Sequence, residues 1–185
     1  MVMKKFLICI IFALSALECY PQSLKFILQR DGTFLTEDGK RYEILSFDGK
    51  TAKDLYDVVY TNAMSFYKSP KNVLSVNEGV SIAVRAYTYT LIDGYGGYYY
   101  LRFEFKDGRM KVVAPSADEL YYSNVTLSSS KFCDVVKHLF KRAAHKNAKK
   151  AAAAREKIET VELDMNYTVS YLAGLLYSSP SNKEW

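Results

Sequence analysis

Two histidines of this sequence have a spacing that could hold a metal ion. His138 and His145 are seven residues apart, which places both on nearly the same face of a helix. Imidazole is a common ligand of zinc and other transition metals. Lys141 and Arg142 lie between the histidines, however, and their positive charge opposes a bound cation. We therefore interpret both histidines as surface residues of a basic helix.

Carboxylates and nucleophiles offer a second kind of chemistry. Asp93, Glu104 and Asp107 lie near strand ends, but they lack the regular alternation of oxygen ligands in a calcium loop. The sequence has no Gly-x-Ser-x-Gly elbow, phosphate loop or dinucleotide fingerprint. Cys133 falls on the apolar stripe of an expected helix, which predicts a small buried side chain and not a nucleophile. We therefore predict no catalytic residue, no metal and no cofactor.

Tyrosine is the most distinctive residue type, with sixteen in the chain. Several surround one expected hairpin, and strand alternation places Tyr98 and Tyr100 on one face and Tyr99 on the other. Exposed tyrosine rings can stack on sugars or anchor a protein partner. The alternative is that tyrosine simply suits strands. The candidate partner-binding residues of this hairpin are Tyr95, Tyr98, Tyr99 and Tyr100.

A basic segment between Lys137 and Lys157 is the second distinctive feature. It holds eight Lys and Arg residues against a single acid, Glu156, within a chain of net charge +5. Lys146, Lys149 and Lys150 are the candidate contact residues. Positive charge on an exported protein favours an acidic protein face, an anionic glycan or a lipid surface, and we expect no nucleic acid. A solvated charged helix with no partner is the alternative.

Export is predicted by the first 22 residues. Lys4 and Lys5 precede an apolar run from Phe6 to Leu17, and polar residues follow. This order is typical of a secretory signal peptide, and the run is shorter than the roughly 20 residues that cross a bilayer. We expect a periplasmic or secreted protein. The alternative is a lipoprotein anchored through Cys19.

The remaining pattern predicts a single α+β domain. Three Asp-Gly pairs mark turns before residue 50, and Thr51 with Asp54 forms a capping-box pattern at the start of a helix that ends near Ser69. Strand-like runs with short connections follow, which favours antiparallel pairing. We interpret residues 118–130 as a loop. The four predicted runs are Val73 to Val76, Val80 to Ile92, Tyr98 to Lys106 and Met110 to Ala114.

This order of elements, together with two short motifs, resembles a known family. Lys50-Thr51-Ala52-Lys53-Asp54-Leu55-Tyr56 and Phe105-Lys106-Asp107-Gly108-Arg109-Met110-Lys111-Val112 are similar to segments of the exported bacterial family known as domain of unknown function 4468. The resemblance covers roughly residues 41 to 114. It implies a TBP-like fold, which is a curved antiparallel sheet with helices packed on one face, and an envelope location. It implies no catalytic residue.

The sequence thus predicts five segments and a binding function. They are a signal peptide (1–22), an N-terminal hairpin or arm (23–40), a TBP-like α+β domain (41–142), a basic and then amphipathic helical extension (143–178) and a disordered tail (179–185). Whether the last helices pack on the domain is left open. The expected function is a non-enzymatic binding or interaction domain of the cell envelope. The alternatives are a hydrolase of envelope polymers, and a structural subunit of an envelope assembly with an apolar patch on the last helix.

Overall fold

The computed structural model describes residues 24–122 and 129–177. This part forms an antiparallel sheet in the order β3-β7-β6-β5-β4, with β8 pairing β7, beside a hairpin of β1 and β2. The strands are β1 (Ile27–Leu28), β2 (Phe34–Leu35), β3 (Tyr42–Ser46), β4 (Leu74–Asn77), β5 (Ser81–Ile92), β6 (Tyr95–Lys106), β7 (Arg109–Tyr122) and β8 (Ser129–Lys131). The helices are α2 (Ala52–Phe66), α3 (Pro70–Val73), α4 (Phe132–Ala143) and α5 (Ala148–Leu172), followed by the short η1 (Leu175–Tyr177). The predicted α+β class is confirmed. The predicted signal peptide and tail lie outside the described residues.

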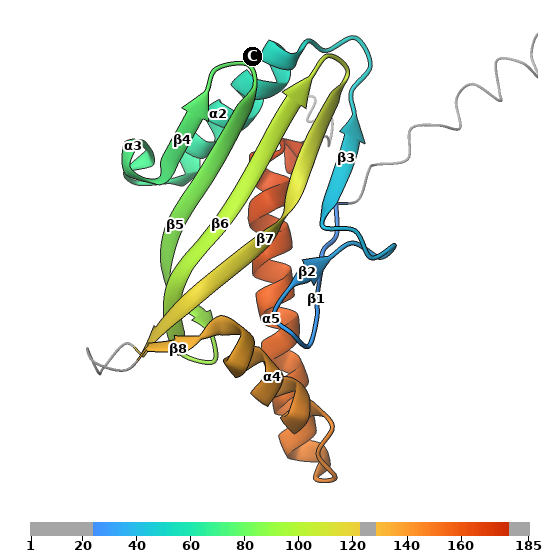
Figure 1. Cartoon of the computed structure of the whole chain (residues 1–185), viewed down its shortest axis with the longest axis vertical. Helices are drawn as coiled ribbons and strands as arrows, with labels where there is room; N and C mark the ends of the chain where they lie inside the picture. Colours follow the sequence, from blue (N-terminus) through green and yellow to red (C-terminus); the bar gives the residue numbers. More distant parts are fainter. Residues whose placement is uncertain (1–23, 123–128, 178–185) are drawn as a thin grey trace, which may run out of the picture.

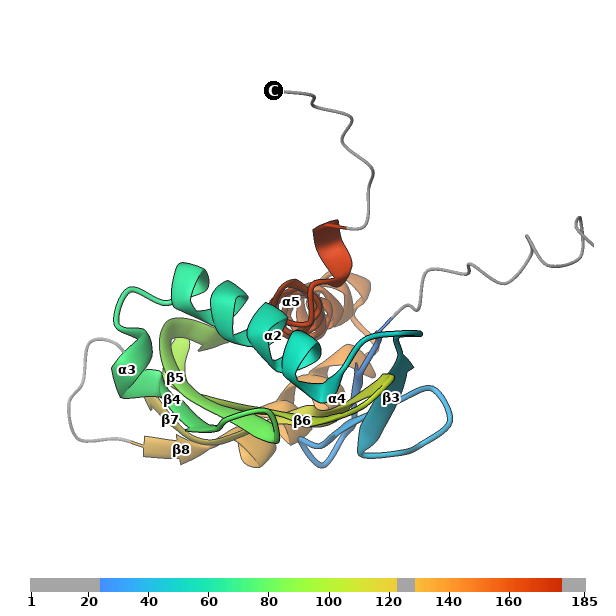
Figure 2. The same cartoon turned by 90° about the horizontal axis from the view of Figure 1, so that it is seen from above.

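The sheet is curved, and its two long helices lie on the same side of it. Figure 1 shows α2 and α5 behind the strands, and Figure 2 shows the sheet bending toward them. The other face of β4, β5 and β6, which we call the outward face, has no described helix over it (Figures 1 and 2). The predicted arrangement of a curved antiparallel sheet with helices on one face is therefore confirmed.

Helix α2 begins as its sequence predicts. The Thr51 hydroxyl accepts from the N–H of Asp54, and the Asp54 carboxylate accepts from the N–H of Thr51, so the capping box is complete. A second cap comes from the turn between β6 and β7, where Asp107 Oδ1 accepts from the Ala52 N–H at 2.8 Å. The start of the helix is therefore held to the sheet as well as to itself.

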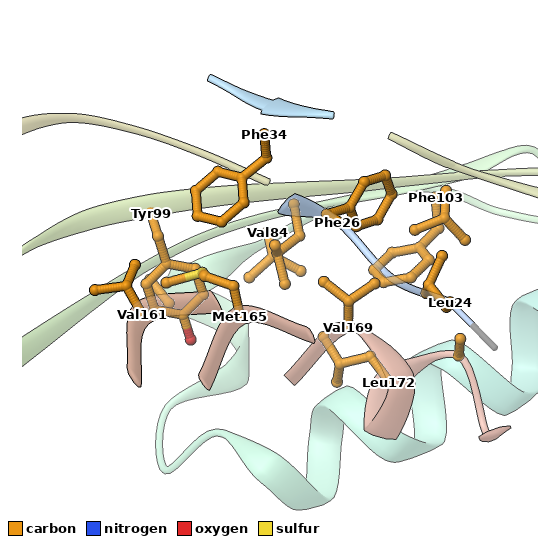
Figure 3. Close-up of a cluster of buried hydrophobic side chains, with 14 of the residues drawn as sticks. Leu24, Phe26, Phe34, Val84, Tyr99, Phe103, Val161, Met165, Val169 and Leu172 are labelled. Atoms are coloured by element: carbon orange, nitrogen blue, oxygen red, sulfur yellow. The ribbon is translucent and has the colours of Figure 1, made fainter. Parts of the chain in front are cut away.

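Helix α5 closes the hydrophobic core. Its apolar stripe packs on the sheet and on α2, and Figure 3 shows Val161, Met165, Val169 and Leu172 facing Phe103 and other core side chains. The remaining buried residues of the stripe are Ala151, Ala154 and Ile158. The question left open by the sequence is thereby answered, because residues 148–172 lie on the domain and do not extend from it.

The N-terminal segment is held by side chains of α5. Asn166 accepts from the Phe26 N–H at 2.7 Å and donates to the Phe26 carbonyl at 2.8 Å. Glu162 Oε1 accepts from the Leu28 N–H at 2.8 Å. The two side chains take the place of a neighbouring strand along one edge of β1, so they satisfy backbone groups that burial would otherwise leave unpaired.

Strand β7 is longer than predicted. The assignment of residues 118–130 to a loop is wrong for 118–122 and for 129–130, whereas 123–128 lie outside the described residues. The register between β6 and β7 shifts twice. The shift between Tyr100 and Arg102 of β6 includes Pro115 of β7. A proline lacks an N–H and normally ends a ladder, but a bulge removes the need for that donor. The strand therefore continues to Tyr122, past Ala114, where the predicted run ended.

Candidate functional site

Four tyrosines and an arginine from β5, β6 and β7 gather on the outward face. Tyr87 and Tyr98 are cross-strand partners, and so are Arg85 and Tyr100. Tyr121 from β7 hydrogen-bonds Glu119. We call Arg85, Tyr87, Tyr98, Tyr100 and Tyr121 the tyrosine cluster.

Arg85 holds the centre of the tyrosine cluster. Its guanidinium carbon lies 3.9 Å from the centroid of the Tyr98 ring, which is a close cation–π contact. Its Nε donates a long hydrogen bond of 3.5 Å to the Tyr100 hydroxyl, and this bond raises the pKa of the guanidinium above its ordinary value. Within the described residues the guanidinium makes no other hydrogen bond, so its remaining N–H groups can meet an acceptor from outside. The arginine is thus oriented by two rings and exposed to solvent.

The rings of the cluster also contact one another. Tyr87 packs edge-on against Tyr98 at 5.2 Å and against Tyr89 at the same centroid distance. The hydrogen bond from Tyr121 to Glu119, at 2.8 Å, raises the pKa of the Tyr121 hydroxyl. Tyr89 is 77% exposed. The rings are therefore held in place without being removed from solvent.

A glycine supports this arrangement. A Cβ atom on Gly96 would lie 2.6 Å from the Tyr87 hydroxyl oxygen and 2.8 Å from the Thr88 carbonyl oxygen. Only glycine leaves room for the Tyr87 ring across the strand. Gly96 and Gly97 are both buried within β6, so close packing and not flexibility requires a glycine at these two positions.

The predicted tyrosine contacts divide between two faces. Tyr98 and Tyr100 lie on the outward face, as alternation predicts. Tyr99 lies on the other face and is only 7% exposed, so its assignment as a contact residue is wrong. Its hydroxyl lies 3.2 Å from that of Tyr67, and burial raises the pKa of both. Tyr95 packs on the core and on Tyr122, with ring centroids 5.2 Å apart, which also removes it from the outward face.

The basic segment is partly used within the fold. Arg142 and Lys157 both pair with Asp93 in the turn between β5 and β6. Arg155 donates to the Ala143 carbonyl at the end of α4. The three predicted contact lysines, Lys146, Lys149 and Lys150, are exposed where α4 turns into α5. They lie at the far lower end of the molecule in Figure 1, apart from the tyrosine cluster.

The residues considered for metal binding stay apart. Among the described residues, no three His, Cys, Asp or Glu side chains gather closely enough to hold a metal ion. Cys133 is half buried against Gly32, so it is more accessible than its apolar stripe predicts. In the described part of the chain, none of the helices has the length and apolarity needed to cross a membrane.

A groove of about 590 Å³ lies between the β1 to β2 turn, β7 and the start of α4. Its lining includes Asp31, Arg41, Asp118, Glu119 and Lys131. Hydrogen bonds from Thr33 lower the pKa of Asp31, whereas a catalytic acid needs a raised one. This groove brings carboxylates and a concave surface together, and so does a hollow of about 550 Å³ that Glu159 and Glu162 line.

Comparison with known proteins gives two structural neighbours. No family model and no curated protein matches the sequence. Solved structures include the family that the sequence resembles. A TBP-like protein from Parabacteroides distasonis ATCC 8503 is 15% identical, with a TM-score of 0.48 over 72% of this chain and 90% of that one. A DUF4468 family protein from Bacteroides ovatus ATCC 8483 is 14% identical, also with a TM-score of 0.48, over 85% of this chain and 94% of that one. Neither description names an activity.

Three members of the tyrosine cluster were not among the predicted contacts. Arg85 and Tyr87 could have been found, because alternation along β5 places them opposite the buried Val84 and Ala86. Tyr121 gave no such signal, since the strand was expected to end before it. Its place depends on the two bulges that let β7 continue.

Proposed function

We propose that this protein is a non-enzymatic binding domain of the cell envelope, and that it contacts its partner through the outward face of the sheet. The observation that carries the proposal is the tyrosine cluster, a preordered group of aromatic rings and one arginine on an uncovered sheet face. The sequence pattern of a signal peptide supports the envelope location.

The physical argument rests on residue type and order. Tyrosine and arginine are the residues that most often dominate the energy of binding interfaces. Arg85, Tyr98 and Tyr100 are already ordered by contacts with one another, so binding costs little side-chain entropy. Strands on both sides fix the backbone beneath them. Lys146, Lys149 and Lys150 are proposed as a second, weaker contact whose exposed charge attracts an anionic partner.

The test is a crosslinking pull-down from the envelope extract of the source organism. We expect the wild-type protein to capture a partner, and Tyr98→Ala to lose most of it because both the ring and the orientation of Arg85 are removed. Tyr60→Ala is the matched control, since this tyrosine is 37% exposed on α2 and lies outside the cluster. Thermal unfolding of each variant checks that it still folds.

The outcomes separate the two contacts. Equal capture by wild type and Tyr98→Ala, with loss in a Lys146, Lys149 and Lys150 to Gln variant, would transfer the site to the basic segment. Capture of nothing by any form would favour the hydrolase alternative, and the groove near Asp31 would be the place to examine next.

One observation favours the structural-subunit alternative. Leu163, Tyr167 and Leu176 are exposed on α5 and η1, on the helical side of the molecule. Exposed apolar side chains close together often mark a contact between subunits. Light scattering tests this alternative, because it requires a wild-type assembly that Leu163→Glu dissociates. A monomeric wild-type protein would dismiss self-assembly through this surface.

A further inference from the structure

The outward face carries two shallow hollows that meet at Arg102. One, of about 430 Å³, is lined by Ser75, Ala83, Arg85, Tyr100 and Ser116 among others. The second, of about 510 Å³, continues toward Ser81, Glu104, Lys106, Arg109 and Lys111. Arg102 lines both. The two hollows are neighbours along the strands, and we call them together the sheet track. Two shallow hollows in a row suit a linear chain better than a compact ligand.

Basic side chains dominate the sheet track. Five of them line the two hollows, against the single acid Glu104. Burial alone would raise the pKa of Glu104, but the ion pairs with Lys111 and Arg102 have the larger effect and lower it. The carboxylate is therefore ionised, and its negative charge is balanced by these two side chains. The track therefore keeps a positive excess toward an incoming ligand. The basic residues are Arg85, Arg102, Lys106, Arg109 and Lys111.

The track also has the aromatic and small residues that a sugar chain needs. Tyr100 lies between Arg85 and Arg102, and the ring of Tyr42 lies 5.0 Å from Lys111 Nζ on the other side of the face. Small side chains at Ser75, Ser81, Ala83 and Ser116 leave the floor open. Aromatic rings pack on the apolar faces of sugars, and the planar guanidinium matches a carboxylate with two parallel hydrogen bonds.

We propose, building on the proposed function, that the sheet track binds a polysaccharide whose sugars carry carboxylates. Arginines pair with the carboxylates and Tyr100 packs on a sugar ring between them. A lipid surface fits less well, since the charges line a depression and not a protruding face. Nucleic acid also combines charge with stacking. The signal-peptide pattern, however, directs this chain to a place where acidic glycans are the commoner polyanions.

Affinity electrophoresis with polygalacturonate tests the proposal, because every sugar of this polymer carries a carboxylate. Its fully methyl-esterified form keeps the backbone and removes the charge. We expect binding of polygalacturonate that is at least about tenfold stronger than binding of the ester. Replacing Arg85 and Arg102 together by Gln should weaken it by about tenfold or more. The control replaces the exposed Lys53 and Lys68 by Gln, which removes the same amount of charge but leaves the track intact.

Each outcome has a clear meaning. Loss in the lysine control equal to that in the arginine variant would show attraction by net charge and overturn the proposal. Equal binding of polyuridylate or of phosphatidylglycerol vesicles would also overturn it, in favour of that polyanion. If the protein does not bind polygalacturonate, the proposal of an acidic polysaccharide as ligand is wrong. The proposed function would still hold if wild type captures a protein partner that Tyr98→Ala loses. Thermal unfolding of the arginine variant excludes misfolding as the cause of a loss.

Discussion

Asn166 is the side chain whose truncation should lower the stability of the fold most in proportion to its size. It makes two hydrogen bonds to the backbone of Phe26, a residue with no exposed surface. Asn166→Ala leaves both backbone groups unpaired, so we expect a loss of about 2–3 kcal/mol in the free energy of unfolding. Urea denaturation measures it. Glu159→Ala, at an exposed position of the same helix, should change stability by less than about 0.5 kcal/mol. Similar values for the two variants would contradict the role assigned to Asn166.

Glu162 makes stability depend on pH in an unusual direction. Its burial raises the pKa above the usual 4.5, although the Leu28 N–H partly offsets this. The folded protein therefore binds this proton more tightly than the unfolded chain. Stability from this group is present below pH 4.5 and is lost as pH rises from there through the raised value.

Glu162→Gln isolates that effect. The Gln side-chain oxygen can still accept from the Leu28 N–H, and no charge has to be buried. We expect the variant to be at least as stable as wild type at neutral pH, with the difference shrinking as the pH falls toward 4.5. Urea denaturation at a series of pH values measures the difference. A variant that is less stable at neutral pH would mean that the ionised carboxylate is favourable where it lies.

At this scale, sequence predicts periodic features and misses pairings. Alternation gave the opposite faces of Tyr98 and Tyr99 because it depends only on neighbours along one strand. The bonds of Asn166 and Glu162 join residues 140 and 134 positions apart. No local pattern contains such information. The same limit applies to Gly96. This position has no room for a side chain because Tyr87 from another strand occupies the space.

The start of helix α2 was predicted closely from the sequence, and it offers a test. Thr51→Ala removes the hydroxyl that accepts from the Asp54 N–H, so we expect a loss of about 1 kcal/mol. Ser69 occupies the equivalent position of α3 but makes no side-chain cap. Ser69→Ala should therefore have little effect. Thermal unfolding compares the two, and equal losses would contradict the importance of the capping box.

Strand ends were harder to predict, for a physical reason. A proline such as Pro115 usually ends a strand, and only the bulged register with β6 allows β7 to continue. The apolar stripe of α5 was predicted from its spacing, whereas its partner surface was not. A stripe shows that a helix must be covered, and the covering surface comes from tertiary structure.

For the whole molecule, α5 decides whether the domain can fold. The predicted extension begins at residue 143, yet α5 buries seven of its residues and packs on α4, α2 and the sheet. A chain ending at Ala144 would expose the opposing core, including Phe26 and Phe103. We expect it to show no cooperative thermal transition by circular dichroism and to aggregate. The full chain with Lys146, Lys149 and Lys150 changed to Gln should unfold cooperatively. A cooperative transition in the shortened chain would instead make α5 an accessory.

The bonds between the first strand and the last helix also set an order in time. A ribosome makes Asn166 140 residues after Phe26, so the edge of β1 that does not face β2 has no partner until α5 is made. Contacts this distant in sequence slow folding as well. For a chain exported as we propose, the delay is useful, because a translocation channel accepts chains that have not yet folded. The domain can then close only once α5 is made and its side chains reach β1.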